Sequence, residues 1–426
     1  MLGPCVVVGR CADHYGAPAE PAAPATGMMC AVRRILGPVA TLVALVAAVA
    51  GAPAAAGGTA PGVRTVLGPD LVDAPGGLAL DTAGDLFVAD TGHCRVLMVP
   101  ARAGTAYGLR LRPEHPAVVA GGSCSGAGSI GHPTGVAVDS QGDVFIAEAT
   151  AQRVQVVRPG GPRTAVTVAG TGSAGFDGDG LAGPAGELDE PTAVAVDGAG
   201  DVFIADTANC RVRVVPARGV TLFGQAMASG HLYTVAGTGV CGTAGQGGPV
   251  GTAQLWDPVA VAVDGAGDLL VADSGDQSVL LAAVQGGNHY GTAVGTGDIG
   301  VVVGGTGGYG PYLADGLAAT GPTAELNDPR GLAVGPTGTL FVTDGFLHAI
   351  RVVPASTGTL LGRVMSGGDL YTVAGAVPVQ SAAGAGDGTR WVLTKLGTPT
   401  GIAVSPSGAV AFSDGTLDAV RVIGAA

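Results

Sequence analysis

The sequence is poor in charged residues, in aromatic residues and above all in lysine. Of its 426 residues, 12% are charged and 4% are aromatic, and Lys395 is the only lysine. With 33 acidic residues against 20 basic ones, the formal net charge is −13, so the basic surface that nucleic-acid binding requires is missing. We therefore expect no nucleic-acid partner, and we interpret the acidity as a source of solubility.

Common sequence signatures of catalysis are missing as well. The chain has no G-x-S-x-G nucleophile elbow, no phosphate-binding Walker loop and no paired histidines at the spacing of a zinc-binding helix. The sequence therefore points to no catalytic residues of these classes.

In contrast, the sequence is rich in glycine, with 77 residues, and in short apolar runs. Within residues 188–216, three such runs lie at 193–196, 202–205 and 212–215, bounded by Asp, Gly, Asn or Pro, and a fourth follows at 233–237. Runs this short and rich in β-branched residues are typical of strands. Four in succession predict one antiparallel sheet.

The connection at residues 197–201 has the composition of a tight hairpin. The Asp197 side chain can cap the turn, and Gly200 stands where a positive φ is required. Asp81, Asp139 and Asp264 occupy the same position in other copies of the pattern, so we interpret them all as turn residues.

This pattern recurs six times, and a proline opens each copy: Pro75, Pro133, Pro191, Pro258, Pro329 and Pro399. A fixed motif with a variable period predicts constant blades joined by variable loops. Residues 63–68 resemble a lone fourth strand, whereas the sixth copy ends after its third run, at 420–423. We therefore predict an all-β, six-bladed β-propeller of four-stranded antiparallel blades, closed by the N-terminal strand pairing into the last blade.

The N-terminal region precedes this repeat and has a different composition. Residues 1–27 show no periodicity and are expected to be an unstructured leader, consistent with a start codon assigned too early. Residues 28–56 combine Arg33 and Arg34, an apolar stretch and a small-residue cleavage site near Ala54–Ala56, which predicts a secretory signal peptide. The alternative is an uncleaved membrane anchor. The propeller would then occupy residues 57–426 of a secreted, extracellular protein.

Four cysteines remain after the predicted signal peptide. Cys94 and Cys210 each precede a third strand, while Cys124 and Cys241 each follow the next fourth strand. Because these places adjoin in an antiparallel hairpin, we predict the disulfides Cys94–Cys124 and Cys210–Cys241, each contributing about 3–4 kcal/mol. Zinc binding by the same four cysteines is the alternative.

An acidic residue ends the second strand of every copy: Asp90, Glu148, Asp206, Asp273, Asp344 and Asp414. A ring of carboxylates is compatible with a metal site or with acid–base catalysis. The structural alternative is that each acid accepts hydrogen bonds from the turn leading to the third strand, and that Arg95, Arg153 and Arg211 pair with it. We favour this alternative because a residue type that occupies the same position in every copy is expected to have a structural role in the repeat.

Two kinds of loop are candidates for binding. Residues 176–180, Phe-Asp-Gly-Asp-Gly, resemble part of a calcium loop but lack its further oxygen ligands, so calcium or another divalent ion is only a weak expectation. The loops within 100–121, 216–237 and 354–375 predict extended hairpins on the outer flank. Tyr107, Phe223 and Tyr233 there are candidates for a contact surface.

The motifs P-x-G/A-V-A-V-D, G-D-V-F-I-A-D and N-C-R-V-R-V-V resemble NHL repeats across residues 63–426. The resemblance implies a six-bladed propeller that binds protein, glycan or other ligands. Some proteins of this architecture are amidating lyases, with three histidines on a channel metal, or lactonases, with Glu, Asn and Asp on one. Here the histidines fall at unlike positions of the repeat, and the asparagines are few: His93, His115, His132, His231, His289 and His348; Asn209, Asn288 and Asn327.

We therefore expect a secreted, monomeric, non-catalytic binding module at or outside the cell envelope, with a protein or glycan partner and no cofactor. It would contact a membrane only through an uncleaved signal segment. The alternative function is that of a metal-dependent hydrolase or lyase that uses channel carboxylates such as Asp90 and Asp206.

Overall fold

The computed structural model describes residues 62–125, 129–161, 163–305, 315–320, 324–375 and 395–424. The chain divides into two units, residues 1–38 and 39–426, and all described residues belong to the second. The predicted leader and signal peptide lie outside the described residues. Among the residues described, no helix is long and apolar enough to cross a membrane.

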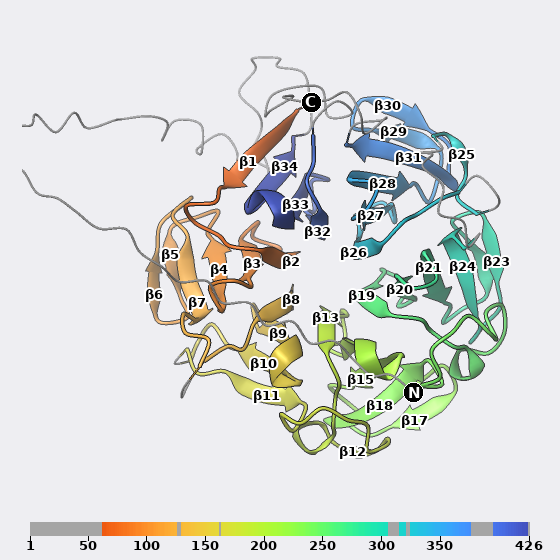
Figure 1. Ribbon diagram of the computed structural model, residues 1–426, viewed down its shortest axis with the longest axis horizontal. Helices are drawn as coiled ribbons and strands as arrows, with labels where there is room; N and C mark the ends of the chain where they lie inside the picture. The colour runs from red at the N-terminus through yellow and green to blue at the C-terminus, as the bar shows by residue number, and fades with distance from the viewer. Residues whose placement is uncertain are drawn as a thin grey trace, which may run out of the picture. The chain divides into compact units, whose positions relative to one another are not determined.

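Six antiparallel sheets are arranged around a centre, and the first strand of each faces that centre (Figure 1). Each inner strand begins at one of the six predicted prolines: β2 (Pro75–Leu80), β8 (Pro133–Val138), β13 (Pro191–Val196), β19 (Pro258–Val263), β26 (Pro329–Val334) and β32 (Pro399–Val404). Proline is tolerated at the first residue of a strand because the ladder needs no N–H from it there. The predicted six-bladed propeller is confirmed.

The second and third strands of each blade form its buried middle. The second strands are β3 (Leu86–Asp90), β9 (Val144–Glu148), β14 (Val202–Asp206), β20 (Leu269–Asp273), β27 (Leu340–Asp344) and β33 (Val410–Asp414). The third strands are β4 (Arg95–Val99), β10 (Arg153–Val157), β15 (Arg211–Val215), β21 (Ser278–Ala282), β28 (Ala349–Val353) and β34 (Ala419–Ile423). All five residues of every second strand are buried, since neighbouring blades pack on both faces.

The fourth strands complete the blades, and the ring closes as predicted. They are β7 (Ala117–Gly121), β11 (Val166–Ala169), β18 (His231–Ala236), β24 (Ile299–Gly304) and β31 (Asp369–Ala374). In blade six this place is taken by β1 (Val63–Leu67), which pairs with β34 so that Val63 lies opposite Ile423 (Figure 1). Blades three and five depart from the predicted four strands, because β12 (Leu181–Ala182) and β25 (Leu317–Ala318) each add a short fifth strand.

The hairpin turns between first and second strands are as the sequence predicted. Asp197 Oδ1 accepts hydrogen bonds from the N–H groups of Ala199 and Asp201, both at 2.8 Å. Gly200 has a φ of +88°, a value that only glycine adopts without strain. Asp81, Asp139 and Asp264 make the same pair of bonds.

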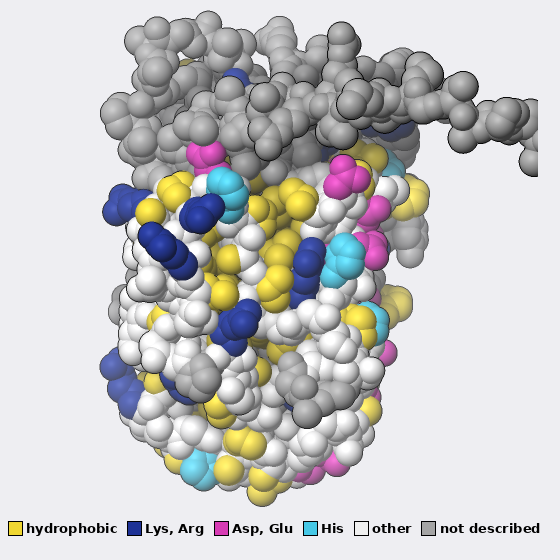
Figure 2. All heavy atoms as spheres, turned by 90° about the vertical axis from the view of Figure 1, so that its left-hand side faces the viewer, with side chains coloured by type: hydrophobic (Ala, Val, Ile, Leu, Met, Phe, Trp, Pro, Cys, Tyr) yellow, Lys and Arg dark blue, Asp and Glu magenta, His cyan; other side chains and the backbone are white. Residues whose placement is uncertain are grey.

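Outer hairpins project from blades one, three, four and five: β5 (Gly104–Ala106) with β6 (Leu109–Leu111), β16 (Val220–Leu222) with β17 (Gln225–Met227), β22 (Gly287–His289) with β23 (Thr292–Val294), and β29 (Gly358–Leu360) with β30 (Arg363–Met365). The hairpin in blade four was not predicted. Figure 2 shows the flank that carries β5 and β6, where hydrophobic side chains gather between basic residues and histidines.

The prediction that Tyr107 belongs to a contact surface is wrong. Its side chain is 2% exposed, and its hydroxyl donates to the Gly142 carbonyl in the turn of blade two at 2.6 Å. Tyr290 makes the equivalent bond to Gly338 of blade five, at 2.9 Å. These hairpins therefore fasten one blade to the next, whereas Phe223 and Tyr233 are half-buried.

Candidate functional site at the mouth of the central channel

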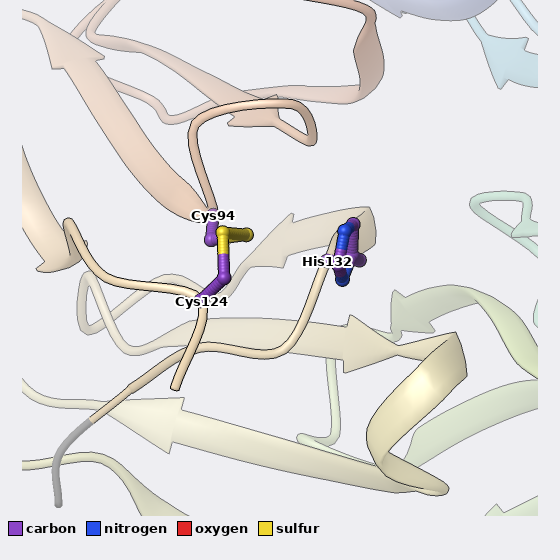
Figure 3. Close-up of side chains that lie close together, drawn as sticks. All are labelled: Cys94, Cys124 and His132. Atoms are coloured by element: carbon purple, nitrogen blue, oxygen red, sulfur yellow. A yellow bond between two sulfur atoms is a disulfide. The ribbon is translucent and has the colours of Figure 1, made fainter. Parts of the chain in front are cut away.

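The four cysteines form the two predicted disulfides. Cys94 bonds to Cys124 and Cys210 bonds to Cys241, with Cα–Cα distances of 5.0 and 5.3 Å. In the part of the chain that the structure describes, the one close group of three potential metal ligands is Cys94, Cys124 and His132 (Figure 3). Both sulfurs are bonded to each other, so neither is a thiolate ligand, and the zinc alternative is wrong for these cysteines.

The six acids that end the second strands are all 0% exposed. Each accepts a backbone hydrogen bond from the residue 17 positions earlier, at 2.7–3.0 Å: Asp73 to Asp90, Gly131 to Glu148, Asp189 to Asp206, Trp256 to Asp273, Asn327 to Asp344 and Gly397 to Asp414. The acids thereby anchor the segment that enters each inner strand. The predicted contacts from the turn before the third strand are present in three blades, where His93 contacts Asp90, Asn209 donates to Asp206 and the Leu347 N–H donates to Asp344.

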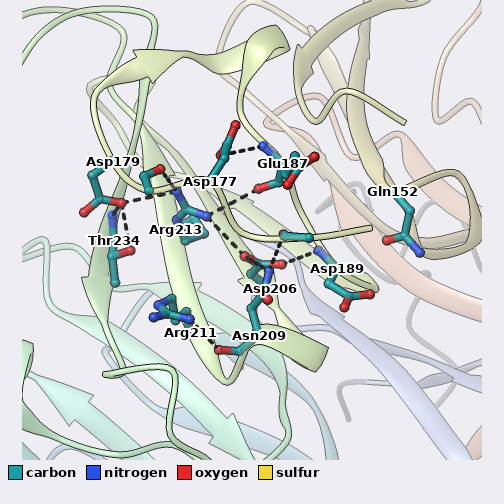
Figure 4. Close-up of polar contacts among 12 residues, drawn as sticks. Gln152, Asp177, Asp179, Glu187, Asp189, Asp206, Asn209, Arg211, Arg213 and Thr234 are labelled. Atoms are coloured by element: carbon teal, nitrogen blue, oxygen red, sulfur yellow. Dashed lines mark hydrogen bonds and ion pairs between the residues drawn. The ribbon is translucent and has the colours of Figure 1, made fainter. Parts of the chain in front are cut away.

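The predicted arginine pairing holds in two blades and fails in the third. Arg95 contacts Asp90 at 2.6 Å and Arg153 contacts Glu148 at 3.0 Å. In blade three, however, Arg213 contacts Asp206, at 3.3 Å (Figure 4). Arg211 instead stacks 3.7 Å from the centre of the Phe176 ring. Burial raises the pKa of Asp206 to about 6, and Arg213 opposes that shift.

The loop that resembles a calcium site is held by protein donors. Asp179 accepts from the Thr234 N–H and hydroxyl, both at 2.9 Å, and from Arg213 at 3.2 Å, while Asp177 accepts from the Glu187 N–H at 2.9 Å (Figure 4). In blade five, Asp315 accepts from Thr372 and Arg363. Asp179 and Asp315 therefore fasten an inter-blade loop to the outer strand of its blade, whereas Asp177 bonds within the loop region.

The centre of the ring contains a cavity of about 450 Å³ lined by the inner strands of all six blades. Its walls are mostly glycine, alanine, valine and threonine, since inner strands must approach one another closely. Gly77 illustrates this, because a Cβ there would lie 2.9 Å from the Cα of Gly135. Asp90 and Asp206, the channel carboxylates of the alternative function, do not line this cavity.

Hydroxyl groups join neighbouring blades around this cavity. At five of the six junctions, a hydroxyl donates to a carbonyl at the start of the next inner strand: Thr91 to Pro133, Thr134 to Pro191, Thr207 to Pro258, Thr343 to Thr400, and Thr400 to Pro75. The junction between blades four and five differs. There the Ser274 hydroxyl donates to the Asp328 carboxylate at 3.0 Å.

Asp328 belongs to a small group of charged residues at this junction. Asp328 pairs with Arg330 at 2.5 Å, and both line the cavity together with Asp257. Burial, and then the charge of Asp328, raise the pKa of Asp257. We call Asp257, Ser274, Asp328 and Arg330 the mouth cluster.

A second cavity, of about 480 Å³, adjoins the mouth cluster and shares Asp257, Ser274 and Asp328 with it. Trp256 lines this cavity and is 52% exposed. Its ring packs on Gly275, where a Cβ would lie 2.6 Å from the indole. An aromatic face and charged groups therefore border one opening.

Sequence comparison assigns the repeat. The family model of the NHL repeat matches residues 131–157 and 188–215, which comprise the first three strands of blades two and three. The chain is an NHL-repeat propeller. No curated protein sequence matches this propeller.

Solved structures share the architecture of this NHL-repeat propeller at low identity. A Bacteroides thetaiotaomicron protein of unknown function is 15% identical, with a TM-score of 0.55 over 86% of this chain and 76% of that one. An auxiliary nutrient binding protein from the same organism is 12% identical, with a TM-score of 0.54 over 85% and 76%. A gluconolactonase from Xanthomonas campestris is 14% identical, with a TM-score of 0.50 over 85% and 89%. Such similarity shows the fold alone.

Sequence reasoning missed the mouth cluster, although a signal for part of it exists. The residue before the opening proline is Ala74, His132, Glu190 and Thr398 in four blades, but aspartate in blades four and five. These aspartates break the repeat at adjacent blades. The sequence could not show that they face the same cavity as Arg330.

Proposed function

We propose that this NHL-repeat propeller is a non-catalytic binding module at or outside the cell envelope, and that it binds a glycan at the mouth cluster. The observation that carries the proposal is the break in the repeat at the junction of blades four and five. Every other junction uses a hydroxyl-to-carbonyl bond, which serves the ring itself. Charged groups at one junction are unnecessary for closing the ring, so they are available for a ligand.

The chemistry of the mouth cluster suits a ligand rich in hydroxyl groups. The carboxylates of Asp257 and Asp328 accept hydrogen bonds, while the half-exposed guanidinium of Arg330 donates them. Trp256 adds an exposed apolar face beside these groups, suited to the C–H face of a sugar ring. Aromatic faces combined with a few convergent polar groups are typical of small-ligand sites.

The location outside the cytoplasm is supported by the two disulfides, which persist in oxidising compartments. Two structurally similar proteins are described as an auxiliary nutrient binding protein and as a gluconolactonase. The first description is compatible with the binding function. The second keeps a hydrolase as the rival function. However, Asp90 and Asp206, the residues expected to serve it, are buried and each is paired with an arginine of the same blade.

Titration calorimetry against soluble envelope glycans tests the proposal. We expect Arg330→Ala to weaken glycan binding roughly 10- to 100-fold, because a charged hydrogen bond contributes about 1.5–3 kcal/mol. Arg110→Ala, which removes an exposed arginine from the outer hairpin of blade one, is the matched control and should bind normally. Glycan binding that is unchanged in Arg330→Ala and in Asp257→Asn would contradict the site.

The same proteins separate binding from catalysis. If the protein only binds its ligand, the wild-type protein should not hydrolyse lactone or ester substrates. Turnover that disappears in Asp257→Asn would instead establish the hydrolase. A protein partner captured from an envelope fraction, with no response to any glycan, would overturn the assignment of the ligand class.

A further inference from the structure

Five of the six blades hold a guanidinium group against the buried acid of the second strand. In blades one and two it comes from the first residue of the third strand, Arg95 or Arg153. In blades three and six it comes from the third residue of that strand, Arg213 or Arg421. In blade five Arg351 stands at the same position, where burial raises the pKa of Asp344 and the charge of Arg351 opposes that rise. Two different positions thus deliver the same group to the same acid.

Each of these guanidinium groups also donates to one backbone carbonyl. The acceptors are Leu71 at 2.7 Å, Ser129 at 3.3 Å, Glu187 at 3.5 Å, Glu325 at 3.3 Å and Lys395 at 2.9 Å. In every blade this carbonyl lies two residues before the N–H that bonds the acid. A buried carboxylate and a fixed carbonyl therefore form a repeated cradle for a guanidinium group.

Blade four has the cradle but neither arginine. Its acid is Asp273, and the equivalent carbonyl belongs to Gln254, two residues before Trp256. The two arginine positions are occupied by Ser278 and Leu280. Asp273 Oδ2 is buried without a hydrogen-bond partner, and among the described residues none donates to the Gln254 carbonyl.

Neighbouring residues in blade four supply no donor to Asp273 in place of the arginine. Asp276 stands where His93 and Asn209 contact the acids of blades one and three, and its own carboxylate accepts from Gln246 and Ser278. Gln277 Oε1 is also buried without a partner, whereas Gln152 at the same position in blade two accepts from Glu190 at 2.6 Å. Blade four thus combines two carboxylates and an amide oxygen with no arginine.

Asp273 is 0% exposed and lies next to the cavity of about 480 Å³ without lining it. Trp256, whose N–H donates to Asp273, and Ser274, Gly275 and Gln277, which follow Asp273 in the chain, do line that cavity. The Trp256 N–H donates to Asp273 Oδ1 at 2.7 Å, so the tryptophan reports directly on this carboxylate. Asp257 adds negative charge to the same cavity.

We propose that Asp273 of blade four is a binding site for a guanidinium group supplied from outside the chain, as carried by an arginine side chain of a partner protein. A guanidinium carries five N–H donors and one positive charge, which matches the unpartnered oxygens and the two aspartates. The cradle holds this group in five blades, and the three-carboxylate convergence of a metal site is not found among the described residues. The site goes beyond the glycan site and does not depend on it.

The test measures the fluorescence of Trp256 in a Trp391→Phe background, since these are the two tryptophans of the chain. Guanidinium chloride and arginine amide are titrated at concentrations too low to unfold the protein, against potassium chloride at equal ionic strength. We expect a saturable change in the wild-type background. Ser278→Arg, which restores the arginine of blade one, and Asp273→Asn should both abolish it.

Blade one provides a matched control that does not rely on the wild-type site. Arg95→Ser removes the guanidinium from Asp90, so guanidinium chloride should raise the melting temperature of this variant more than potassium chloride does. No saturable response in the wild-type background, or an equal response in Asp273→Asn, would overturn the proposal. A response to calcium chloride but not to guanidinium would overturn it in favour of a metal site. Glycan binding by Arg330 variants is measured without guanidinium, so the two proposals fail separately.

Discussion

The Thr400 hydroxyl donates to the Pro75 carbonyl at 2.9 Å across 325 residues of sequence. This bond joins the last inner strand to the first, at the junction where Ser413 also donates to Gly76 at 2.5 Å. On the outer side of the same blade, β1 supplies the missing fourth strand. The ends of the propeller are therefore joined at its inner and its outer side.

We predict that Thr400→Val weakens this closure. The substitution keeps the shape of the side chain but removes the hydrogen bond of the hydroxyl in a part-buried site. The free energy of unfolding should therefore fall by about 0.5–1.5 kcal/mol. Urea unfolding measures the change. Thr359→Val, at an exposed position of the outer hairpin in blade five, should leave the midpoint unchanged. Equal midpoints for both variants would show that the bond does not support closure.

Removing Arg213 should be far more harmful than removing Arg211. Arg213 is 0% exposed and is the arginine that contacts the buried Asp206. Its replacement by leucine leaves that carboxylate without its counter-charge, which costs on the order of 3–5 kcal/mol. Arg211→Ala removes a more exposed side chain stacked on Phe176 and should cost much less. A ranking in the reverse order, by urea unfolding, would contradict the assignment.

The stability of the protein should fall as the pH rises toward 8 because of Asp273. Burial, with smaller contributions from Asp276 and Asp257, raises the pKa of Asp273 from 3.8 to about 8. The folded protein therefore holds a proton that the unfolded chain releases, and stability declines through this interval by about 1.4 kcal/mol per pH unit for one such group. Thermal unfolding across this range measures the decline.

The matched variant for this prediction is Asp273→Asn, which keeps an oxygen for the Trp256 N–H but does not titrate. Its stability should depend less on pH than that of the wild type, and it should be the more stable of the two above pH 8. Burial also raises the pKa of Asp206 and of Asp344, and both residues contribute equally to the pH dependence of stability in the two proteins. The difference between the two pH profiles therefore reports on Asp273 alone. Parallel pH profiles would contradict the shift.

Removing both disulfides should destabilise the propeller without changing its fold. Each bridge closes a loop of about 30 residues, for which the chain-entropy model gives about 3–4 kcal/mol. Free-thiol titration of the native chain without the first 56 residues should find none, and reduction should lower the unfolding midpoint. Four free thiols before reduction would contradict the pairing.

The mouth cluster and the Asp273 cradle could not be predicted from the sequence, although the blades could. The strand pattern, the opening prolines and the turn aspartates obey local rules with fixed spacing, so each is visible in a short window. The role of Arg213 was missed because the sequence pattern pointed to the first residue of the third strand, where Arg95 stands in blade one. Arg213 is the third residue of its strand, yet its guanidinium group contacts the equivalent acid of blade three. Only the packing shows that the two positions are equivalent.

The sequence by itself determined the number of blades, the closing strand and the cysteine pairing, because each follows from periodicity and from the adjacency of antiparallel strands. The tertiary structure decided which carboxylates are buried, which of them hold an arginine, and which face a cavity. Burial and pairing depend on residues from other blades, such as Ser274 and Asp328, which lie 54 positions apart and meet at one junction. Charge and hydrogen-bonding capacity are properties of single residues, but their energetic effect is set by neighbours that the chain brings together only on folding.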